Sequence, residues 1–173
     1  MRRHTRRPRI ETIALLVILG LLAGGDVAAH SKDREAKLSL KAGGLDGPIL
    51  SNGDTTLTNA SISQGTLKIE AARATVTRKD SEVTRVVLEG SPASLQQEND
   101  DGVLMRAQAH RIDYDTGNET VSLTGEVLIS EGRDEFRGER VNYDTRNGRT
   151  TGTGGEGGRI ELIINPKPRK TAD

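Results

Sequence analysis

Residues 66–71 read Thr-Leu-Lys-Ile-Glu-Ala, and this short alternation decides the fold class. Because successive side chains of a strand point to opposite faces, Leu67, Ile69 and Ala71 would share one face of a sheet. The same period of two recurs in Val86 and Leu88, Ile112 and Tyr114, Val121 and Leu123, Val127 and Ile129, Val141 and Tyr143, and Ile160 and Leu162. After Ser31 no apolar stripe keeps helical spacing for three turns, so the sequence predicts an all-β protein.

Turn-forming residues separate the alternating segments. They lie at Asn52–Asp54, Glu89–Pro92, Asn99–Gly102, Thr116–Asn118 and Arg146–Gly148. Asn-Gly and Asp-Gly pairs accept a positive φ and join neighbouring antiparallel strands. A strand about every 8–12 residues is typical of sandwiches, barrels and spirals.

The sequence also repeats itself. Two segments match others further along the chain: Ala109–Thr116 matches Gly138–Thr145, and Ile62–Gly65 matches Ile129–Gly132, with Ile69 then matching Phe136. One strand–turn–strand unit is therefore used several times. Such repetition predicts a stack of strands in which each rung covers the next and the two ends stay uncovered.

The start of the chain has the pattern of an export signal. A basic segment with five Arg residues precedes the uncharged apolar run Ile13–Ala23, and Val27-Ala28-Ala29 follows. This order predicts cleavage after Ala29, which makes His30 the first mature residue. The apolar run is much shorter than the roughly 20 residues of a membrane-spanning helix, which favours a cleaved signal over a membrane anchor.

Charge and composition exclude several classes of protein. The full chain has 25 basic and 25 acidic residues, and losing five Arg and two acidic residues with the signal leaves a net charge near −3. A nucleic-acid-binding protein usually has a basic excess, and adhesion to anionic membranes needs one as well. The chain has no Cys, so it contains neither disulfides nor thiolate metal sites.

Four segments follow from these patterns. We expect a cleaved signal peptide over residues 1–29, a flexible N-terminal segment over 30–44, one β domain over 45–164 and a flexible tail over 165–173.

Catalytic and metal-binding patterns are weak. The mature chain keeps His30 and His110, has no G-x-S-x-G motif and shows no Ser placed beside a His and its carboxylate. The segment Asp113–Asn118 resembles part of a calcium loop, but the Glu expected at position twelve of such a loop is missing. We therefore predict no enzyme activity, no metal and no cofactor.

Several stretches together resemble a known family. They are Asn59–Arg78, Gly90–Ala93, Leu123–Ile129 and Gly138–Tyr143. In this order they are similar to the lipopolysaccharide transport periplasmic protein A (LptA) family, whose domain is called OstA-like. The resemblance covers about residues 45–165, nearly the whole mature chain.

The resemblance implies a single-domain antiparallel β-jellyroll, or spiral, with open ends. It implies a periplasmic protein whose apolar interior holds the acyl chains of lipid A and which moves lipopolysaccharide from the inner to the outer membrane. In the family such modules join end to end as homo-oligomers. They connect an inner-membrane transporter complex, through its anchored OstA-like component, to an outer-membrane lipopolysaccharide assembly protein.

Candidate site residues follow from the resemblance and the alternation. The candidate lumen residues are Ile62, Leu67, Ile69, Val86, Leu88, Ile112, Tyr114, Leu123, Ile129, Phe136, Val141 and Tyr143. The candidate C-terminal assembly edge is Ile160, Leu162 and Ile164.

Three alternatives remain at this point. The chain could be the membrane-anchored sister component of the same pathway, which is LptC-like and keeps its N-terminal helix. It could be a structural or adhesive β-stack without a lipid ligand. It could also be a disordered exported polypeptide.

Overall fold

The computed structural model describes residues 36–49, 51–99, 101–155 and 158–165. The expected cleavage point between Ala29 and His30 lies outside these residues, as does nearly all of the expected tail. The described residues form strands and turns without any helix, and so contain no helix that could cross a membrane. The all-β prediction is therefore confirmed, and the alternative of a disordered polypeptide is wrong for this part of the chain.

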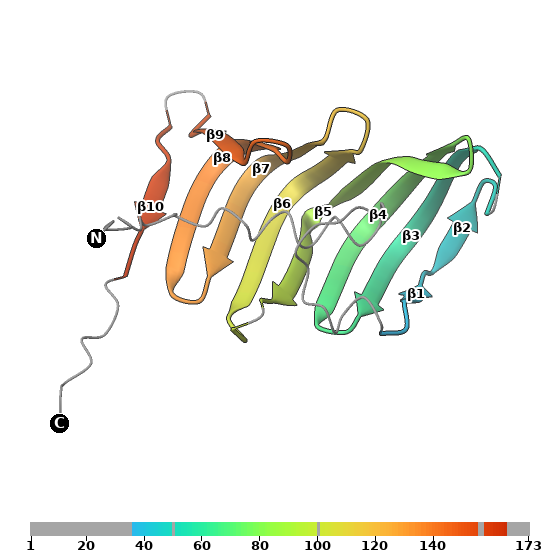
Figure 1. The fold of residues 1–173 in the computed structure, drawn as a ribbon, viewed down its shortest axis with the longest axis horizontal. Coiled ribbons are helices and arrows are strands. Elements are labelled where there is room, and N and C mark those ends of the chain that lie inside the picture. The colour runs from blue at the N-terminus through green and yellow to red at the C-terminus, as the bar shows by residue number, and fades with distance from the viewer. Residues whose placement is uncertain (1–35, 50, 100, 156–157, 166–173) are drawn as a thin grey trace, which may run out of the picture.

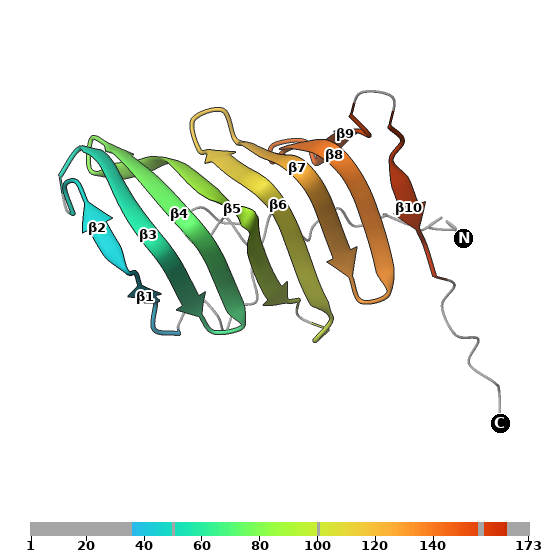
Figure 2. The same ribbon diagram turned by 180° about the vertical axis from the view of Figure 1, so that it is seen from behind.

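One antiparallel sheet contains ten strands, in the order β1-β3-β4-β5-β6-β7-β8-β10 (Figures 1 and 2). The short strands β2 and β9 pair with β3 and β8, beside β1 and β10. The strands are β1 (Ser39–Lys41), β2 (Gly44–Asp46), β3 (Gly53–Gln64), β4 (Leu67–Lys79), β5 (Glu82–Glu98), β6 (Leu104–Asp115), β7 (Thr120–Glu131), β8 (Asp134–Asp144), β9 (Arg149–Thr153) and β10 (Glu161–Ile163).

The sheet begins earlier than its sequence indicates. β1 and the start of β2 lie within residues 30–44, which were expected to be flexible, and β1 pairs with β3 so that Leu40 faces Ile62. The side chain of Gln64 also donates a hydrogen bond to the carbonyl of Ala36 at 3.1 Å. An edge strand is paired along one side and buries few side chains, so it leaves little alternation in the sequence.

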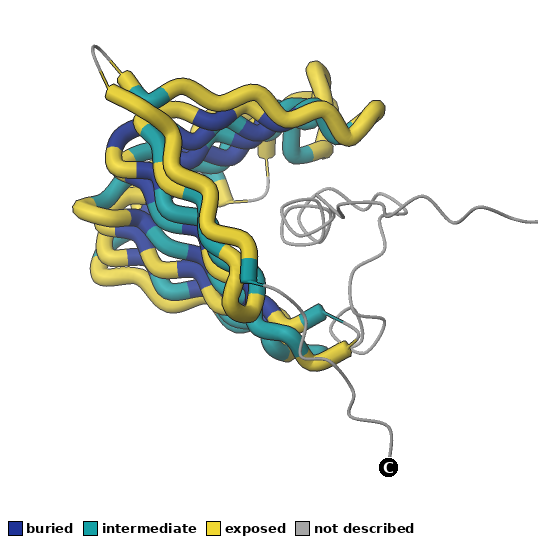
Figure 3. Tube along the Cα trace, turned by 90° about the vertical axis from the view of Figure 1, so that its left-hand side faces the viewer, coloured by how far each residue is buried: buried dark blue, intermediate teal, exposed yellow. Residues whose placement is uncertain are grey.

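Each long strand departs from regular pairing or regular backbone geometry in one row that crosses the sheet from strand to strand. Register shifts lie between Glu70 and Arg73 in β4, Glu89 and Ala93 in β5, Gln108 and Arg111 in β6, and Thr124 and Val127 in β7. Asn59 in β3 has a φ of 49° at this level. Extra residues in one strand bend it and increase its twist. We call this row the fold line; it bends the sheet into two arms (Figure 3).

Glu89–Pro92 is not a turn between strands, as its composition predicted. It lies inside β5, a single strand of 17 residues, where it crosses the fold line. Gly90 is required there, because a Cβ atom on it would lie 2.7 Å from the backbone nitrogen of Ala93. Gly and Pro are found both in turns and at bulges, so local composition does not distinguish the two.

The predicted repeat is a repeat of structure as well. Tyr114 in β6 and Tyr143 in β8 both face Val121 of the intervening strand β7. The Thr that ends each repeat donates a hydrogen bond to the preceding hairpin in the same way. Thr116 Oγ1 donates to the carbonyl of Thr84 at 3.1 Å, and Thr145 Oγ1 donates to that of Glu119 at 2.9 Å. The sheet therefore grows by adding similar hairpins, as the sequence predicted.

Small side chains line the inside of the bend. Ala60 faces Ala71, and Ala93 faces Ala109, next to the fold line. All four are buried, and Ala93 and Ala109 are fully inaccessible. The inside of a bent sheet has the least room for side chains, which explains why the chain uses Ala here.

We expect Ala93→Leu to lower the free energy of unfolding by about 1–3 kcal/mol, because the added atoms overpack this corner. The exposed Ala72 lies on the same fold line, so Ala72→Leu is the matched control and should change stability by less than about 0.5 kcal/mol. Urea unfolding followed by circular dichroism measures both. Equal losses in the two variants would contradict this account of the corner.

Candidate functional site: the apolar inner face

The twelve candidate lumen residues come together in space. Ten of them are buried in one apolar cluster, and the other two, Ile129 and Phe136, are partly buried and pack against it. Because one cluster contains residues from both arms, we infer that its side chains lie on the inside of the bend. The bend itself is visible in Figure 3. We call this surface the inner face. That these residues contact lipid stays a prediction.

Strand pairing arranges the inner face in continuous rungs. In the arm that contains β1 and β10, one rung runs through Leu40, Ile62, Ile69, Leu95, Ala107, Ile129, Phe136 and Leu162. In the arm that contains β2 and β9, another runs through Leu45, Leu57, Ala74, Leu88, Ile112, Leu123, Val141 and Gly152. Neither rung contains a charged or polar side chain from one end of the sheet to the other.

Two tyrosines add aromatic surface to the inner face. Tyr114 and Tyr143 are both buried, and burial raises the pKa of each phenol above its ordinary value. The nearby carboxylates of Glu119 and Asp144 raise the same pKa values further, for Tyr114 and Tyr143 respectively. The phenols therefore stay uncharged to higher pH than in water, and the inner face stays free of charge there.

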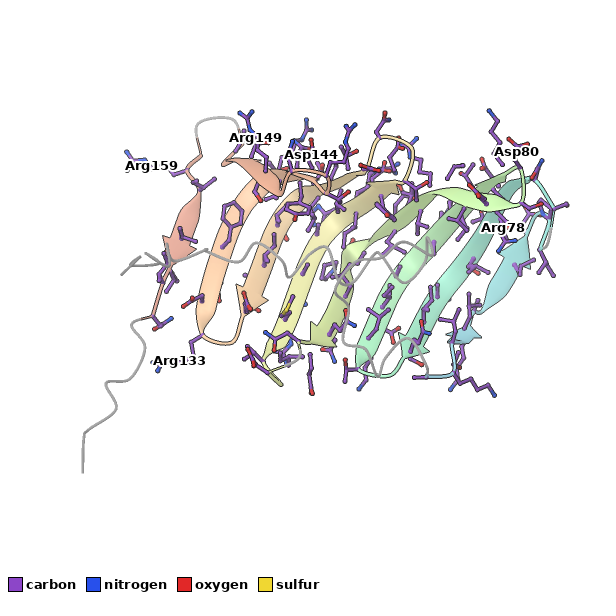
Figure 4. All side chains as sticks on the ribbon, in the orientation of Figure 1. Arg78, Asp80, Arg133, Asp144, Arg149 and Arg159 are labelled. Carbon is purple, nitrogen blue, oxygen red and sulfur yellow. The ribbon has the colours of Figure 1, made fainter. Side chains whose placement is uncertain are left out.

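Charged side chains lie on the opposite face and along the margins. Figure 4 shows the labelled Arg78, Asp80, Arg133 and Arg149 at the ends of the strands, directed away from the sheet. In the middle of the outer face, Arg85 Nε donates to Asp113 Oδ1 at 2.8 Å. The alternation thus separates an apolar inner face from a polar outer face.

Asp113 is the centre of an ion-pair network. Arg85 donates to both of its carboxylate oxygens, Arg111 Nη2 lies 3.2 Å from Oδ2, and Arg111 also pairs with Glu89. The hydrogen bonds from Arg85 are the main cause that lowers the pKa of Asp113. They link β5 to β6 across the sheet.

We expect Asp113→Asn to reduce stability at neutral pH by roughly 0.5–1 kcal/mol, the range of a partly exposed ion pair. A carboxyl whose pKa is lower in the folded state stabilises it above the unfolded pKa, and this contribution is lost as pH falls through the folded pKa. The difference from the native chain should therefore shrink below about pH 4. Urea unfolding at pH 7 and pH 3 measures it, with Asp101→Asn in an exposed turn as control; a difference that is as large at pH 3 as at pH 7 would contradict the ion-pair account.

The residues that resemble part of a calcium loop are used in a turn. Asp115 accepts hydrogen bonds from the backbone and side-chain nitrogens of Asn118, at 2.9 and 2.8 Å, and these lower its pKa. Asp113 is held by Arg85, as described above. Among the residues that the structure describes, no group of three or more His, Asp or Glu side chains could hold a metal ion.

His110 lies at the fold line on the outer face. Its Nε2 is 3.4 Å from Glu126 Oε2, and its ring packs on Gly125, where a Cβ atom would lie 2.6 Å from Nδ1. Ser91 lines the same shallow hollow. No hydrogen bond joins Ser91 to His110 among the described contacts, so the hydroxyl–imidazole pair of a serine nucleophile is not formed there.

Exposed apolar residues gather at the two ends of the sheet. The expected edge residues Ile160, Leu162 and Ile164 are all exposed, and Leu162 lies in β10 opposite Phe136. The exposed large hydrophobic residues of the described chain are Leu38, Leu40, Leu45 and Ile49 at one end, and Ile160, Leu162, Ile163 and Ile164 at the other. The residues at the N-terminal end were missed because Leu40 and Leu45 lie in strands of only three residues, and Leu38 and Ile49 lie outside the strands.

A bent, open-ended antiparallel sheet with an apolar inner face defines a β-jellyroll of the OstA-like class. Residues 51–149 match the family model described as LptA/(LptD N-terminal domain) LPS transport protein. The chain belongs to this family.

Individual relatives support the assignment. The chain is 26% identical over 110 residues to the lipopolysaccharide export system protein LptA of Escherichia coli K12, covering 62% of this chain and 60% of that protein. It is 26% identical over 117 residues to LptA of Haemophilus influenzae, covering 66% and 68%. The match thus spans about 60% of the length of the Escherichia coli relative.

A solved structure shows the same fold. It is the crystal structure of LptH, the LptA homologous periplasmic component of the conserved lipopolysaccharide transport device from Pseudomonas aeruginosa. The match has a TM-score of 0.63 and 21% identity, and covers 78% of this chain and 99% of that chain.

Proposed function

We propose that this protein is a periplasmic lipopolysaccharide carrier that binds the acyl chains of lipid A on its inner face. It acts as a transport component rather than as an enzyme. The observation that carries the proposal is the pair of apolar rungs, which run without interruption from β1 and β2 to β10 and β9. Names of the family and its relatives support the same substrate class.

The physical need for such a carrier is large. An exposed acyl chain costs about 0.8 kcal/mol per CH₂ in water, or on the order of 10 kcal/mol for twelve carbons. An apolar inner face removes much of this cost. Rungs of Leu, Ile, Val and Ala offer similar contacts at each step, so a chain could slide from one rung to the next.

End-to-end assembly fits the geometry of the sheet. Neighbouring strands in the order β1 to β10 are antiparallel, so β1 and β10 run in opposite directions. Copies stacked in one orientation would therefore continue the antiparallel pattern, β10 of one copy beside β1 of the next. Leu162 and Leu40 end the same rung, so the apolar path would continue as well. Strand addition of this kind is a common mode of recognition.

The partners in this proposal are of three kinds. They are further copies of the chain, an inner-membrane transporter complex reached through its anchored OstA-like component, and an outer-membrane lipopolysaccharide assembly protein. Each would add a strand to one open end. The alternating directions and the exposed apolar residues at both ends support this arrangement.

The decisive experiment uses photo-crosslinking amino acids in cells. Crosslinkers at Ile69, Leu123 and Phe136 face inward and are expected to capture lipopolysaccharide. Crosslinkers at their neighbours Lys68, Ser122 and Arg137, on the outer face, are the controls. Equal capture at both sets, or none at the inner set, would refute the carrier and favour an adhesive β-stack. Mass spectrometry of lipid that co-purifies with the native protein provides a second readout.

The removal of the export signal can be tested separately from lipid binding. We propose that residues 1–29 are removed on export, so that the mature chain begins at His30, shortly before β1 at Ser39, and ends in a short tail over 165–173. N-terminal sequencing of the cell-envelope form is expected to start at His30. Retention of Met1 would favour the membrane-anchored sister component instead.

A further inference from the structure

Near the C-terminal end of the inner face, an aromatic side chain packs on two glycines. Phe136 lies on β8 and packs against the apolar cluster. A Cβ atom built on Gly138 would lie 3.1 Å from its Cε1, and one built on Gly152 would lie 2.9 Å from its Cζ. The ring therefore occupies the space where side chains at these positions would stand.

The ring spans the bend at that point. Phe136 belongs to the arm of β10, because it pairs with Leu162. Gly152, on β9, belongs to the other arm, because it pairs with Val141 of β8. Gly138 lies between them, next to the fold line, where it faces Val127. The ring thus reaches from one arm to the other on the inside of the sheet.

The repeat shows that this arrangement is specific to the C-terminal end. Phe136 corresponds to Ile69 at an offset of 67 residues, and Gly138 corresponds to Ala71. Near the other end, Ile69 and Ala71 are both buried as an aliphatic pair. At β8, a larger side chain and a smaller neighbour replace this pair. Among the residues that the structure describes, only the short strands β9 and β10 follow β8.

We propose that the Phe136 ring is a gate at the C-terminal end of the inner face, which an acyl chain must displace to pass to the next copy. This inference rests on the proposed carrier function. In the seated position the ring fills the inside of the bend beside Gly152. When it turns off the two glycines, space opens along the rung between Ile129 and Leu162 for a sliding chain.

Two variants test the gate in different ways. Phe136→Ala removes the ring, and Gly152→Ala adds a methyl group that displaces it without removing apolar surface. Both should exchange lipid A faster, by about tenfold, because lowering a gate speeds entry and exit alike. For Gly152→Ala the Kd should therefore stay within about twofold of the native value. Ile69→Ala, at the equivalent position of the repeat, is the matched control for lost apolar contact and should raise dissociation and Kd together.

The measurement uses full-length mature protein and lipid A with a fluorescent acyl label. Stopped-flow fluorescence gives the rates of association and dissociation, equilibrium titration gives Kd, and circular dichroism checks that each variant keeps its sheet. Faster exchange in both directions with an unchanged Kd in Gly152→Ala supports the gate. Native rates in both variants overturn it and leave the carrier function standing. So does a faster dissociation of Gly152→Ala that is matched by a weaker Kd. Absence of lipid A binding by the native protein overturns both.

Discussion

Replacing Ile129 with Glu is expected to weaken the binding of lipid A strongly while leaving the β-sheet folded. Ile129 lies in the middle of the rung, between Ala107 and Phe136, and is only partly buried. A carboxylate there would lose its water when an acyl chain covers it. This should cost about 3 kcal/mol or more, which weakens Kd by about a hundredfold.

Leu128→Glu is the matched control for this change. Leu128 is the adjacent residue on β7, and because strand residues alternate between faces it points to the outer face. It lines the outer hollow beside His110. Titration with lipid A compares the two variants, and circular dichroism confirms their sheets. Similar affinities for both would show that the inner face is not where acyl chains bind.

Replacing Leu162 with Lys is expected to stop end-to-end assembly and leave a monomer. Leu162 is 61% exposed on β10 and ends the rung that Leu40, 49% exposed on β1, would continue in the next copy. A Lys on an edge strand opposes strand addition, because its charge would lie on the apolar inner face beside Leu40 of the next copy. Sedimentation over a range of protein concentrations measures the assembly state. Leu40→Lys should have the same effect from the other end.

Mixing these two monomeric variants provides the sharpest version of the test. The Leu162→Lys chain keeps an intact N-terminal end, and the Leu40→Lys chain keeps an intact C-terminal end. Because head-to-tail contacts join unlike surfaces, the mixture should form heterodimers and stop there. Ile163→Lys changes the neighbouring residue of β10, which points to the other face, and should weaken assembly less. A mixture that stays monomeric, or single variants that still form filaments, would refute the head-to-tail arrangement.

Much of the candidate site could be read from the sequence, since the twelve lumen residues lie in or against one apolar cluster. Leu95 and Leu57 belong to the same rungs and were missed. Leu95 lies between Ser94 and Gln96, with the small Ala93 on its own face, so its alternation is weak. The N-terminal edge was missed because Leu40 and Leu45 stand in three-residue strands.

The sequence by itself determined the all-β class, the side chains of the inner face and the repeated hairpins. These are local properties, because neighbouring residues of a strand point to opposite faces wherever the strand lies. Only the tertiary structure decided where the sheet bends. Glu89–Pro92 bends β5 rather than ending it, and Ala93, Gly138 and Gly152 are small because they lie inside that bend or under the Phe136 ring. A bend of this kind requires irregularities in several strands to align, and that alignment exists only after distant parts of the chain have paired.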